Sequence, residues 1–591
     1  MKRYSHALTA IILCVLIVMP GCNFFGSSRQ HEVHPPKDPK VANCEPGRWG
    51  GRLKLPLVGA PLTFNPFLPA TLETYEITSK LFGTLLDFDY VDQKFNNPAD
   101  GLARSIDSLS DGRTFVVHLR EGNSFSDGTP ITADDVVFSF QAALDDRTDS
   151  VYGDLMRIDG QPPKFTKEDA LSVRITFADH LEPVKYLFAK LPIVSKASLE
   201  PAFLKGNLKD AYSLETAPEK IVCSGPFVVK SYTPDKQIDL DYNKYYWKVD
   251  SSGTSLPYLD GVTYFLKTTR EAQAHSMLTK GEFHAVQVLQ KDIEMFKGND
   301  RFIVRNQGPS LHTWQLVLNW RADPKKIDPS HATWFRTHGF RWALSSAVDR
   351  KRLANEVFNS LARPVYNQVT PSNTTWYHDA VKKYEHNPTK AHKYLADLKY
   401  QWTDAGILKD LGGRTVRFNI THLNEYVPTQ IVQRLIEDFK KLGIQVESEP
   451  KEYKDFWKVL NLGIYDAILV ESTPMLPDPA FLQPYLNKNG RFFWFYEVSA
   501  GDIALRGMVT STEGWMDRVS KNMNEALKKL LLTERRDLYN QVQVDWAEKS
   551  PIIYLVNDDV VVAAQNVIGN FKPAVLDPTM TWNIEEFYLK N

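Results

Sequence analysis

The stretch "DGTPITADDVVFSF" at residues 127–140 places two adjacent carboxylates directly before an apolar run. Neighbouring side chains on a helix point about 100° apart, so two adjacent carboxylates cannot act together on one substrate atom. Thr132 instead has the position of an N-cap, and Asp135, three residues later, completes a capping box. Ile131 and Val136 add a hydrophobic staple. The stretch therefore predicts the start of a helix and not a catalytic pair.

Short strands are predicted on both sides of this helix. Residues 113–120, 172–178 and 237–243 each alternate apolar and polar side chains, the pattern of a strand with one buried face. No repeat at a fixed period accompanies them, which excludes solenoids and propellers.

A strand, helix, strand unit is predicted in the C-terminal half. Residues 414–421 and 444–450 alternate like strands. Between them, residues 428–443 carry apolar residues on one helical face, from Ile431 to Phe439, and end in a glycine. A helix between two strands implies a parallel pair with a right-handed crossover, so the predicted fold class is α/β.

Length and charge narrow the function classes. The 591 residues predict about three to four domain-sized units. The formal net charge is −1, which argues against nucleic acid or an anionic membrane surface as the main partner. Small neutral or mixed ligands stay open.

The N-terminus, "MKRYSHALTAIILCVLIVMPGC", has a basic start and a short apolar run, as a secretion signal does. Its end resembles the bacterial lipoprotein processing site, which predicts cleavage before Cys22 and lipidation of that cysteine. Met19 and Pro20 depart from the usual residues of the site, so an ordinary signal peptide cut nearby stays open. The polar, proline-containing segment that follows, residues 23–43, is interpreted as a tether.

Two cysteines remain in the mature chain under this interpretation. Cys14 leaves with the signal and Cys22 carries lipid, so Cys44 and Cys223 are left. In an oxidising envelope compartment such a pair suggests a disulfide, while two separate buried thiols are the alternative.

Sequence motifs of catalysis are absent. No HExxH, GxSxG, GxxxxGK[ST] or CxxC pattern occurs, and the histidines are scattered, so we expect no enzyme activity, metal site or cofactor. A hydrolase with two distant carboxylates is the weak alternative. Trp314, Trp376 and Trp494 are candidate walls of a ligand cleft, although a buried core is the commoner position for any one tryptophan.

These segments resemble a known family. The sequences "PLTFNPFLPATLETYEITSKLFGTLLDFD" and "DGLARSIDSLSDGRTFVVHLREGNSFSDGTPITADDVVFSF" are similar to the N-terminal signature of the bacterial extracellular solute-binding proteins of family 5, the oligopeptide and dipeptide binders of ABC importers. The likeness continues through segments such as "CSGPFVVKSYTPDKQIDLDYNKYYW" and "TERRDLYNQVQVDWAEKSPIIYL". It covers nearly all of residues 50–571.

The resemblance implies an α/β, two-lobed periplasmic-binding-protein type II fold with an extra inserted domain. Hinge strands join two lobes that close over a ligand. With the N-terminal segments, the expected divisions are a signal peptide at 1–22, a tether at 23–43, lobe I at 44–78 plus 205–305 plus 548–591, domain II at 79–204, and lobe III at 306–547.

The resemblance also implies where a ligand lies. Relatives hold it between the loop after the first strand, here Thr71 to Thr74, and a segment that precedes an Asp–Pro pair. In this chain that segment is Glu471, Ser472 and Thr473. Its backbone groups are expected to bind an extended ligand, with Trp314, Trp376 and Trp494 as walls.

One position departs from the family pattern. Peptide binders place an Asp three residues before the Asp–Pro pair, where it binds the α-amino group of the peptide. The pair here is Asp478 and Pro479, and the position in question is Met475. A thioether cannot neutralise an ammonium. Either Glu471 substitutes for the missing Asp or the ligand lacks that amine, since relatives also bind metal chelates, oligosaccharides, opines and modified peptides.

The expected function is that of a lipid-anchored substrate-binding protein of an ABC importer. It would act as a monomer on the extracytoplasmic face of the cell envelope, with a peptide or small-molecule ligand and permease subunits as partners. The alternative is a secreted sensory or interaction protein that presents a bound ligand to a receptor.

Overall fold

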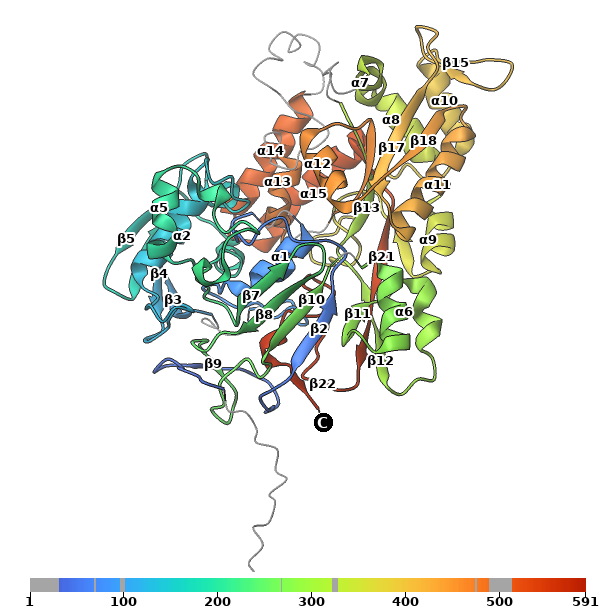
Figure 1. The fold of residues 1–591 in the computed structure, drawn as a ribbon. Coiled ribbons are helices and arrows are strands. Elements are labelled where there is room, and N and C mark those ends of the chain that lie inside the picture. Colours follow the sequence, from blue (N-terminus) through green and yellow to red (C-terminus); the bar gives the residue numbers. More distant parts are fainter. Residues whose placement is uncertain are drawn as a thin grey trace, which may run out of the picture.

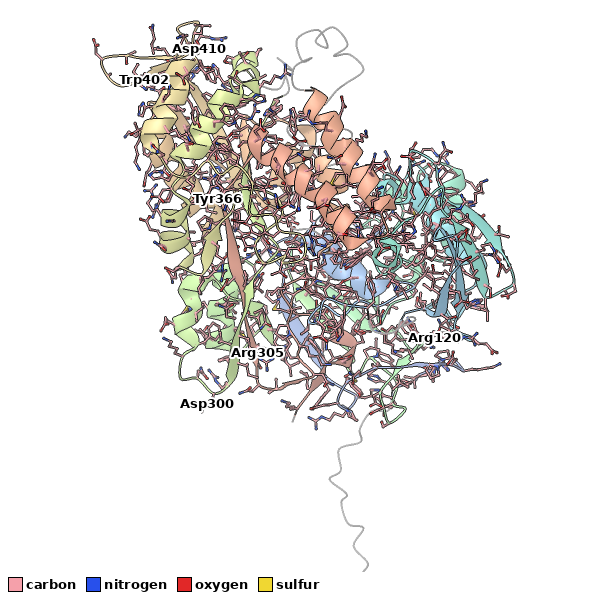
Figure 2. All side chains as sticks on the ribbon, turned by 180° about the vertical axis from the view of Figure 1, so that it is seen from behind. Arg120, Asp300, Arg305, Tyr366, Trp402 and Asp410 are labelled. Carbon is pink, nitrogen blue, oxygen red and sulfur yellow. The ribbon has the colours of Figure 1, made fainter. Side chains whose placement is uncertain are left out.

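The computed structural model describes residues 31–68, 71–95, 101–266, 268–320, 328–472, 476–487 and 513–590. Of the candidate site residues and the departing position named above, Cys22, Thr473, Met475 and Trp494 lie outside the described residues. Figure 1 shows domain II at the left, lobe I below it and at the centre, and lobe III at the upper right. In the view from behind, Arg120 and Asp410 lie at opposite edges of the molecule (Figure 2).

Lobe I is built on a four-stranded sheet in the order β2, β10, β8, β7. Strand β2 pairs in parallel with β10, and the other neighbours are antiparallel. The elements of this region are β2 (Arg52–Pro56), α1 (Leu72–Leu81), β7 (Phe227–Thr233), β8 (Gln237–Tyr242), β10 (Gly261–Phe265) and α6 (Arg270–Lys280).

Domain II contains an antiparallel sheet in the order β3, β4, β6, β5. Its elements are β3 (Ala103–Ser108), β4 (Thr114–Leu119), α2 (Ala133–Leu144), α3 (Gly153–Met156), β5 (Lys164–Lys167), β6 (Ser172–Thr176), α4 (Val184–Phe188) and α5 (Lys196–Leu204). The predicted helix start is confirmed, because the capping box at Thr132 forms and its backbone N–H donates to the Asp135 carboxylate at 2.9 Å. Asp135 also accepts from the backbone N–H of Lys196 at 2.9 Å, which ties α2 to α5.

Lobe III contains a five-stranded mixed sheet in the order β18, β17, β19, β13, β20. The predicted strand, helix, strand unit is confirmed, because β17 and β18 pair in parallel on either side of α11. The strands are β13 (Thr313–Leu318), β17 (Arg417–Leu423), β18 (Gln445–Lys451), β19 (Ala467–Ser472) and β20 (Ile552–Tyr554). The helices are α7 (Pro329–Arg336), α8 (His338–Ala347), α9 (Arg350–Phe358), α10 (Pro388–Asp397), α11 (Tyr426–Lys440), α12 (Tyr453–Leu462), α13 (Gln483–Leu486), α14 (Glu513–Lys528) and α15 (Leu532–Lys549).

Two extended connections join the lobe III sheet to a smaller sheet beside lobe I. The smaller sheet contains β11 (Ala285–Gln287), β12 (Phe302–Pro309), β14 (Ala362–Pro364) and β21 (Val556–Gln565). Strand β12 is followed at once by β13, and β20 is followed at once by β21. These two crossings have the position of hinge strands. Strand β20 belongs to the lobe III sheet, although the expected range of lobe I begins at residue 548.

Short elements complete the fold. They are β1 (Lys40–Val41), β9 (Lys248–Val249), β15 (Gln401–Trp402), β16 (Leu408–Lys409), β22 (Ile568–Gly569), β23 (Tyr588–Leu589) and the 3₁₀ turns Leu208–Asp210, Pro218–Lys220, Gln290–Phe296, Pro479–Leu482 and Ile584–Glu586. The last part of the predicted tether is packed against the protein, because β1 pairs with β9 and His31 stacks on Tyr242 at 4.0 Å between ring centroids.

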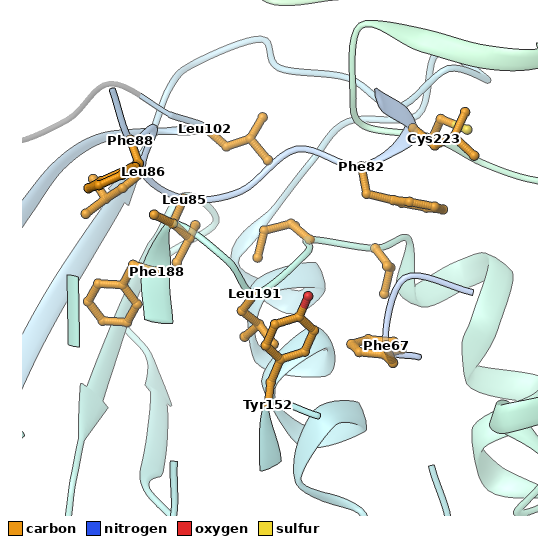
Figure 3. Packing of buried hydrophobic residues seen from close by; sticks show 14 of the residues in the cluster. Phe67, Phe82, Leu85, Leu86, Phe88, Leu102, Tyr152, Phe188, Leu191 and Cys223 are labelled. Atoms are coloured by element: carbon orange, nitrogen blue, oxygen red, sulfur yellow. The ribbon is translucent and has the colours of Figure 1, made fainter. Parts of the chain in front are cut away.

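The hydrophobic core has two main parts. One cluster runs continuously through lobe I and domain II, and Figure 3 shows a portion of it with Phe82, Leu191 and Cys223. A second cluster fills lobe III and includes Trp314, Trp376 and Trp546. The first cluster also includes Leu476, Phe481 and Leu527 from the lobe III range, and Phe481 packs against Tyr186 of domain II, so the two lobes share apolar contacts in this structure.

The predicted disulfide is wrong, since Cys44 and Cys223 are both free thiols. Cys223 is buried in the first cluster, where its Sγ contacts the carbonyl oxygen of Ile221 at 3.3 Å. Cys44 lies in a different environment, near Tyr258 and Glu586. Burial raises the pKa of Cys44 to about 11 and that of Cys223 to about 12, so both thiols stay protonated and unreactive at neutral pH.

The described residues contain neither a candidate membrane span nor a candidate metal site. No helix there combines the length and the apolar character that crossing a bilayer requires. In the same part of the chain, no three His, Cys, Asp or Glu side chains gather into a group that could hold a metal ion.

Candidate ligand-binding site

A cavity of about 170 Å³ lies between lobe I and lobe III. Lobe I contributes the first turn of α1, the start of α6 and Asp577. Lobe III contributes residues from β13 and β19 and from the first turns of α11 and α12. The ends of three parallel strands meet here, because β17, β18 and β19 run in the same direction and finish at this edge. Carboxyl ends of parallel strands are the usual place for ligands in α/β sheets.

The first turn of α1 brings Thr71 to the cavity. Thr71 is the N-cap of the helix, and its hydroxyl accepts from the backbone N–H of Thr74 at 3.1 Å. Thr74 is fully buried beneath it, where its hydroxyl accepts from the backbone N–H of Leu62 at 2.9 Å. The structure therefore places Thr71 at the cavity, and it places Thr74 behind the wall as a support for the helix start.

Strands β13 and β19 form the floor of the cavity. Trp314 lies directly opposite Glu471 in this antiparallel pair, so both side chains project from the same face of the sheet. Both line the cavity, as does Ser472. Trp314 is only 5% exposed, and its indole N–H has no hydrogen-bond partner among the described residues.

Trp376 does not line the cavity. It lies in the core of lobe III, where its ring is 4.9 Å from the Arg535 guanidinium carbon and meets Tyr539 edge to face at 5.3 Å. The prediction that Trp376 forms a cleft wall is therefore wrong. Trp376 instead has the buried core position that is the commoner one for a tryptophan.

Glu471 takes part in a chain of charges that connects the lobes. Its carboxylate is 3.0 Å from Nδ1 of His312 and 3.6 Å from Arg270. Nε2 of His312 is 2.9 Å from the carboxylate of Asp577 on the lobe I side. Burial alone lowers the pKa of His312, but the carboxylates of Asp577 and Glu471 outweigh it and hold that pKa well above its ordinary value. His312 is thus a charged bridge between two carboxylates.

Two further carboxylates lie on the cavity wall. Glu73, in the first turn of α1, accepts a hydrogen bond from the hydroxyl of Tyr453 at the start of α12. Burial raises the pKa of Glu73 to about 7, the Tyr453 hydrogen bond opposes this rise, and the charge on Glu425 adds to it. Burial also raises the pKa of Glu425, with Arg270 acting in the opposite direction.

Sequence reasoning missed Glu73, Glu425, Tyr453, Arg270 and His312. A signal for two of them was available: Glu425 and Tyr453 follow the predicted strands at 414–421 and 444–450 closely, at the strand ends where ligands bind. Glu73 lies within the expected segment from Thr71 to Thr74 but was not singled out there, and no pattern in the sequence indicates that Arg270 and His312 lie near it.

A larger hollow of about 790 Å³ lies between lobe I and domain II. Its charged residues largely pair with one another, since Lys248 is 2.6 Å from Asp87 and 2.7 Å from Glu585. Lys190 donates to the hydroxyl of Tyr90 at 2.8 Å, and burial lowers its pKa to about 7. Size alone therefore does not identify the ligand site. The cavity between the lobes is the one that opening and closing would change.

The α/β fold with a cavity between two lobes is that of the periplasmic binding proteins. The profile of the bacterial extracellular solute-binding proteins, family 5 middle region, matches residues 97–493, and the chain belongs to this family.

Three similar proteins illustrate the range of the family. A probable ABC transporter-binding protein from Deinococcus radiodurans is 28% identical over 70% of this chain and 71% of its own length. The oligopeptide-binding protein AppA from Bacillus subtilis is 24% identical over 85% of this chain and 87% of its own length. The structure of the binding protein MelB from Agrobacterium fabrum, in complex with stachyose, has a TM-score of 0.78 and 22% identity, covering 94% of this chain and 88% of that one.

Proposed function

We propose that this protein captures a solute between lobes I and III and delivers it to the permease of an ABC importer. The observation that carries the proposal is the cavity between the lobes, whose walls come from both sides of the hinge strands. The buried, unpartnered indole N–H of Trp314 supports it. A buried donor without a hydrogen bond costs free energy, and an acceptor on a bound solute would supply that bond. The relatives described as transporter-binding and oligopeptide-binding proteins support the transport role.

The solute we propose is a peptide or a peptide-like molecule. Backbone groups of Glu471 and Ser472 at the end of β19 lie at the cavity, where they can bind an extended chain. Tyr426, Phe456 and Trp457 supply apolar walls of the kind that small-molecule sites use. Sugar ligands in a relative such as MelB make a carbohydrate the natural competitor in any test.

The remaining parts of the proposal concern the whole protein. It has no catalytic activity and no cofactor, acts as a monomer, and is held on the extracytoplasmic face of a membrane by lipid on Cys22. Two or more acyl chains anchor a protein stably where one is marginal. Cys22→Ser should therefore move the protein from the membrane fraction to the soluble fraction, and unchanged membrane association would contradict the anchor.

The direct test is to isolate the protein gently and release whatever it holds. Mass spectrometry should find one solute per protein after denaturation, and the stripped protein should rebind that solute. Small-angle scattering should show a smaller radius of gyration on rebinding, because closure brings the lobes together. A protein that carries no solute and takes none from a cell extract would overturn the proposal.

A further inference from the structure

The walls of the cavity carry a strong excess of negative charge. Among the described residues that line it, the carboxylates are Glu73, Glu271, Glu425, Glu471 and Asp577, against the single guanidinium of Arg270. A cavity partly closed from water makes like charges costly, because their repulsion is screened less than at a surface. Carboxylates that are neutralised by cations of the protein have a structural role. Those without such a partner are available to a ligand.

Two of the carboxylates are neutralised within the protein. Glu471 is 3.0 Å from His312 and 3.6 Å from Arg270, and Asp577 is 2.9 Å from the other nitrogen of His312. Arg270 and His312 therefore balance the charges of Glu471 and Asp577. Glu471 is consequently not available as a substitute for the amine-binding Asp that peptide-binding relatives carry.

Neither Glu73 nor Glu425 forms an ion pair with a described residue, although the charge of Arg270 acts on both. The one side-chain hydrogen bond that Glu73 makes among the described residues comes from the neutral hydroxyl of Tyr453. Glu425 is the N-cap residue of α11, but its side chain does not cap that helix and has neither a hydrogen bond nor an ion pair there. Each carboxylate thus lies at the cavity without the partner that a structural role would give it.

A separate observation points to a ligand at the same cavity. Trp314 is 5% exposed, and its indole N–H has no partner in the described part of the chain. A buried donor without an acceptor costs free energy in the empty protein. An acceptor atom on a ligand would remove that cost, so the cavity offers the indole N–H of Trp314 as a donor as well as two carboxylates.

We infer that the ligand carries a protonated amine or guanidinium that binds between Glu73 and Glu425, and an acceptor oxygen that binds the indole N–H of Trp314. This inference rests on the proposed function and adds the charge of the solute. A peptide has both features, with its carbonyl groups as acceptors. Its cation is either the terminal ammonium or a basic side chain.

The first experiment uses the solute released from the purified protein. Its net charge at neutral pH is determined by mass spectrometry and capillary electrophoresis. A solute with at least one basic nitrogen supports the inference. A solute without a protonated basic nitrogen at neutral pH overturns it while leaving the solute-binding function intact, and a protein that neither holds nor takes up any solute overturns both.

The second experiment compares matched probes by calorimetry with the stripped protein. Ala-Arg-Ala and Ala-citrulline-Ala differ in the charge of one side chain, and the N-acetyl form of each removes the terminal ammonium. Stachyose serves as a neutral carbohydrate. We expect removal of the recognised cation to weaken binding at least about tenfold. If the citrulline probe binds more weakly, the cation is the basic side chain; if the N-acetyl probe binds more weakly, the cation is the terminal ammonium. Equal binding of the fully neutral peptide or of stachyose contradicts the inference.

Variants locate the cation. Glu73→Gln and Glu425→Gln should each remove most of the preference for the charged probe, while Glu447→Gln, an exposed glutamate of β18, should keep it. A preference that survives both variants would overturn the assignment to these two residues.

The pH dependence provides an independent readout. Tyr453, Glu425 and Arg270 are the groups that act on Glu73, which gains its charge near pH 7. Affinity for the cationic probe should therefore rise between about pH 6 and pH 8 in the unaltered protein and rise less in Glu73→Gln. The same slope in both proteins would contradict the role of Glu73.

Discussion

Two sets of charges in this molecule differ in how completely they are paired. In the core of lobe III, Arg535 donates to both oxygens of Asp478 at 2.8 Å, and the two side chains are only 5% and 2% exposed. Arg535 also donates to the carbonyl of Ala526, and Asp478 accepts from the backbone N–H of Ala480. At the cavity, Glu73 and Glu425 form no ion pair with a described residue.

The paired charges stabilise the fold, and the unpaired charges are available to bind a ligand. A charge pair that satisfies itself inside a core holds segments of the chain in place, and Asp478 with Arg535 joins the turn after β19 to α15. Carboxylates that remain unpaired in a cavity raise the free energy of the empty protein, and they lower it again when a cation binds. Removing a member of the first set should cost stability, and removing a member of the second should cost affinity.

The largest effect is expected for Arg535→Met. The substitution leaves the Asp478 carboxylate buried without its partner, which typically costs about 3–5 kcal/mol of folding free energy. Urea unfolding of the ligand-free protein measures the loss. The double variant Asp478→Asn with Arg535→Met removes the unpaired buried charge and should recover part of the stability. If Arg535→Met alone is as stable as the parent, this ion pair does not stabilise the fold.

A smaller effect of opposite sign is expected for Glu73→Gln. The carboxyl has an ordinary pKa of 4.5 and keeps its proton to about 7 in the folded protein. Between these values the unfolded chain binds fewer protons than the folded one, so the contribution of Glu73 to stability falls as the pH rises. The Gln variant should therefore be more stable than the parent at pH 8, by on the order of 1–3 kcal/mol, and about equal at pH 4.

Thermal unfolding of the ligand-free proteins across this pH range tests the sign. Glu447→Gln, on the exposed side of β18, is the control and should follow the parent at every pH. A Glu73→Gln protein that is less stable at pH 8 would mean that the carboxylate is a structural element like Asp478.

The sequence predicted the local structure well because local structure depends on neighbours. The capping box at Thr132 and Asp135, and the parallel pair around α11, involve residues close together in the chain or a regular apolar period. Family resemblance added the two-lobed arrangement and placed Thr71, Glu471 and Ser472 at the cavity. Thr473, Met475 and Trp494 lie outside the described residues, so their roles stay predictions.

Long-range contacts could not be predicted in this way. The disulfide failed because two cysteines bond only when their backbones approach closely, and composition does not show that distance. Trp314 and Trp376 look alike in the sequence, but one lines the cavity and the other packs on Arg535 from a helix more than 150 residues away, as the numbering shows. The same limit hid the meeting of Glu73 with Tyr453.

The smallest effect on stability is expected for Trp314→Phe, which keeps an aromatic ring at the cavity and removes the indole N–H. The loss of packing and the loss of an unpartnered buried donor oppose each other, so folding free energy should change by less than about 1.5 kcal/mol. Binding of the released native solute should weaken about five- to tenfold, the value of one hydrogen bond.

Trp376→Phe is the matched control, because it makes the same substitution in the paired, buried set. It weakens the contact of Trp376 with Arg535 and should lower stability by roughly 1 kcal/mol while leaving solute affinity unchanged. Titration calorimetry should therefore detect a loss of affinity in Trp314→Phe alone, and urea unfolding should detect the larger loss of stability in Trp376→Phe. Equal affinity for the parent and Trp314→Phe would place Trp314 with Trp376 as a structural residue, and the cavity would then lack the donor that we assign to solute recognition.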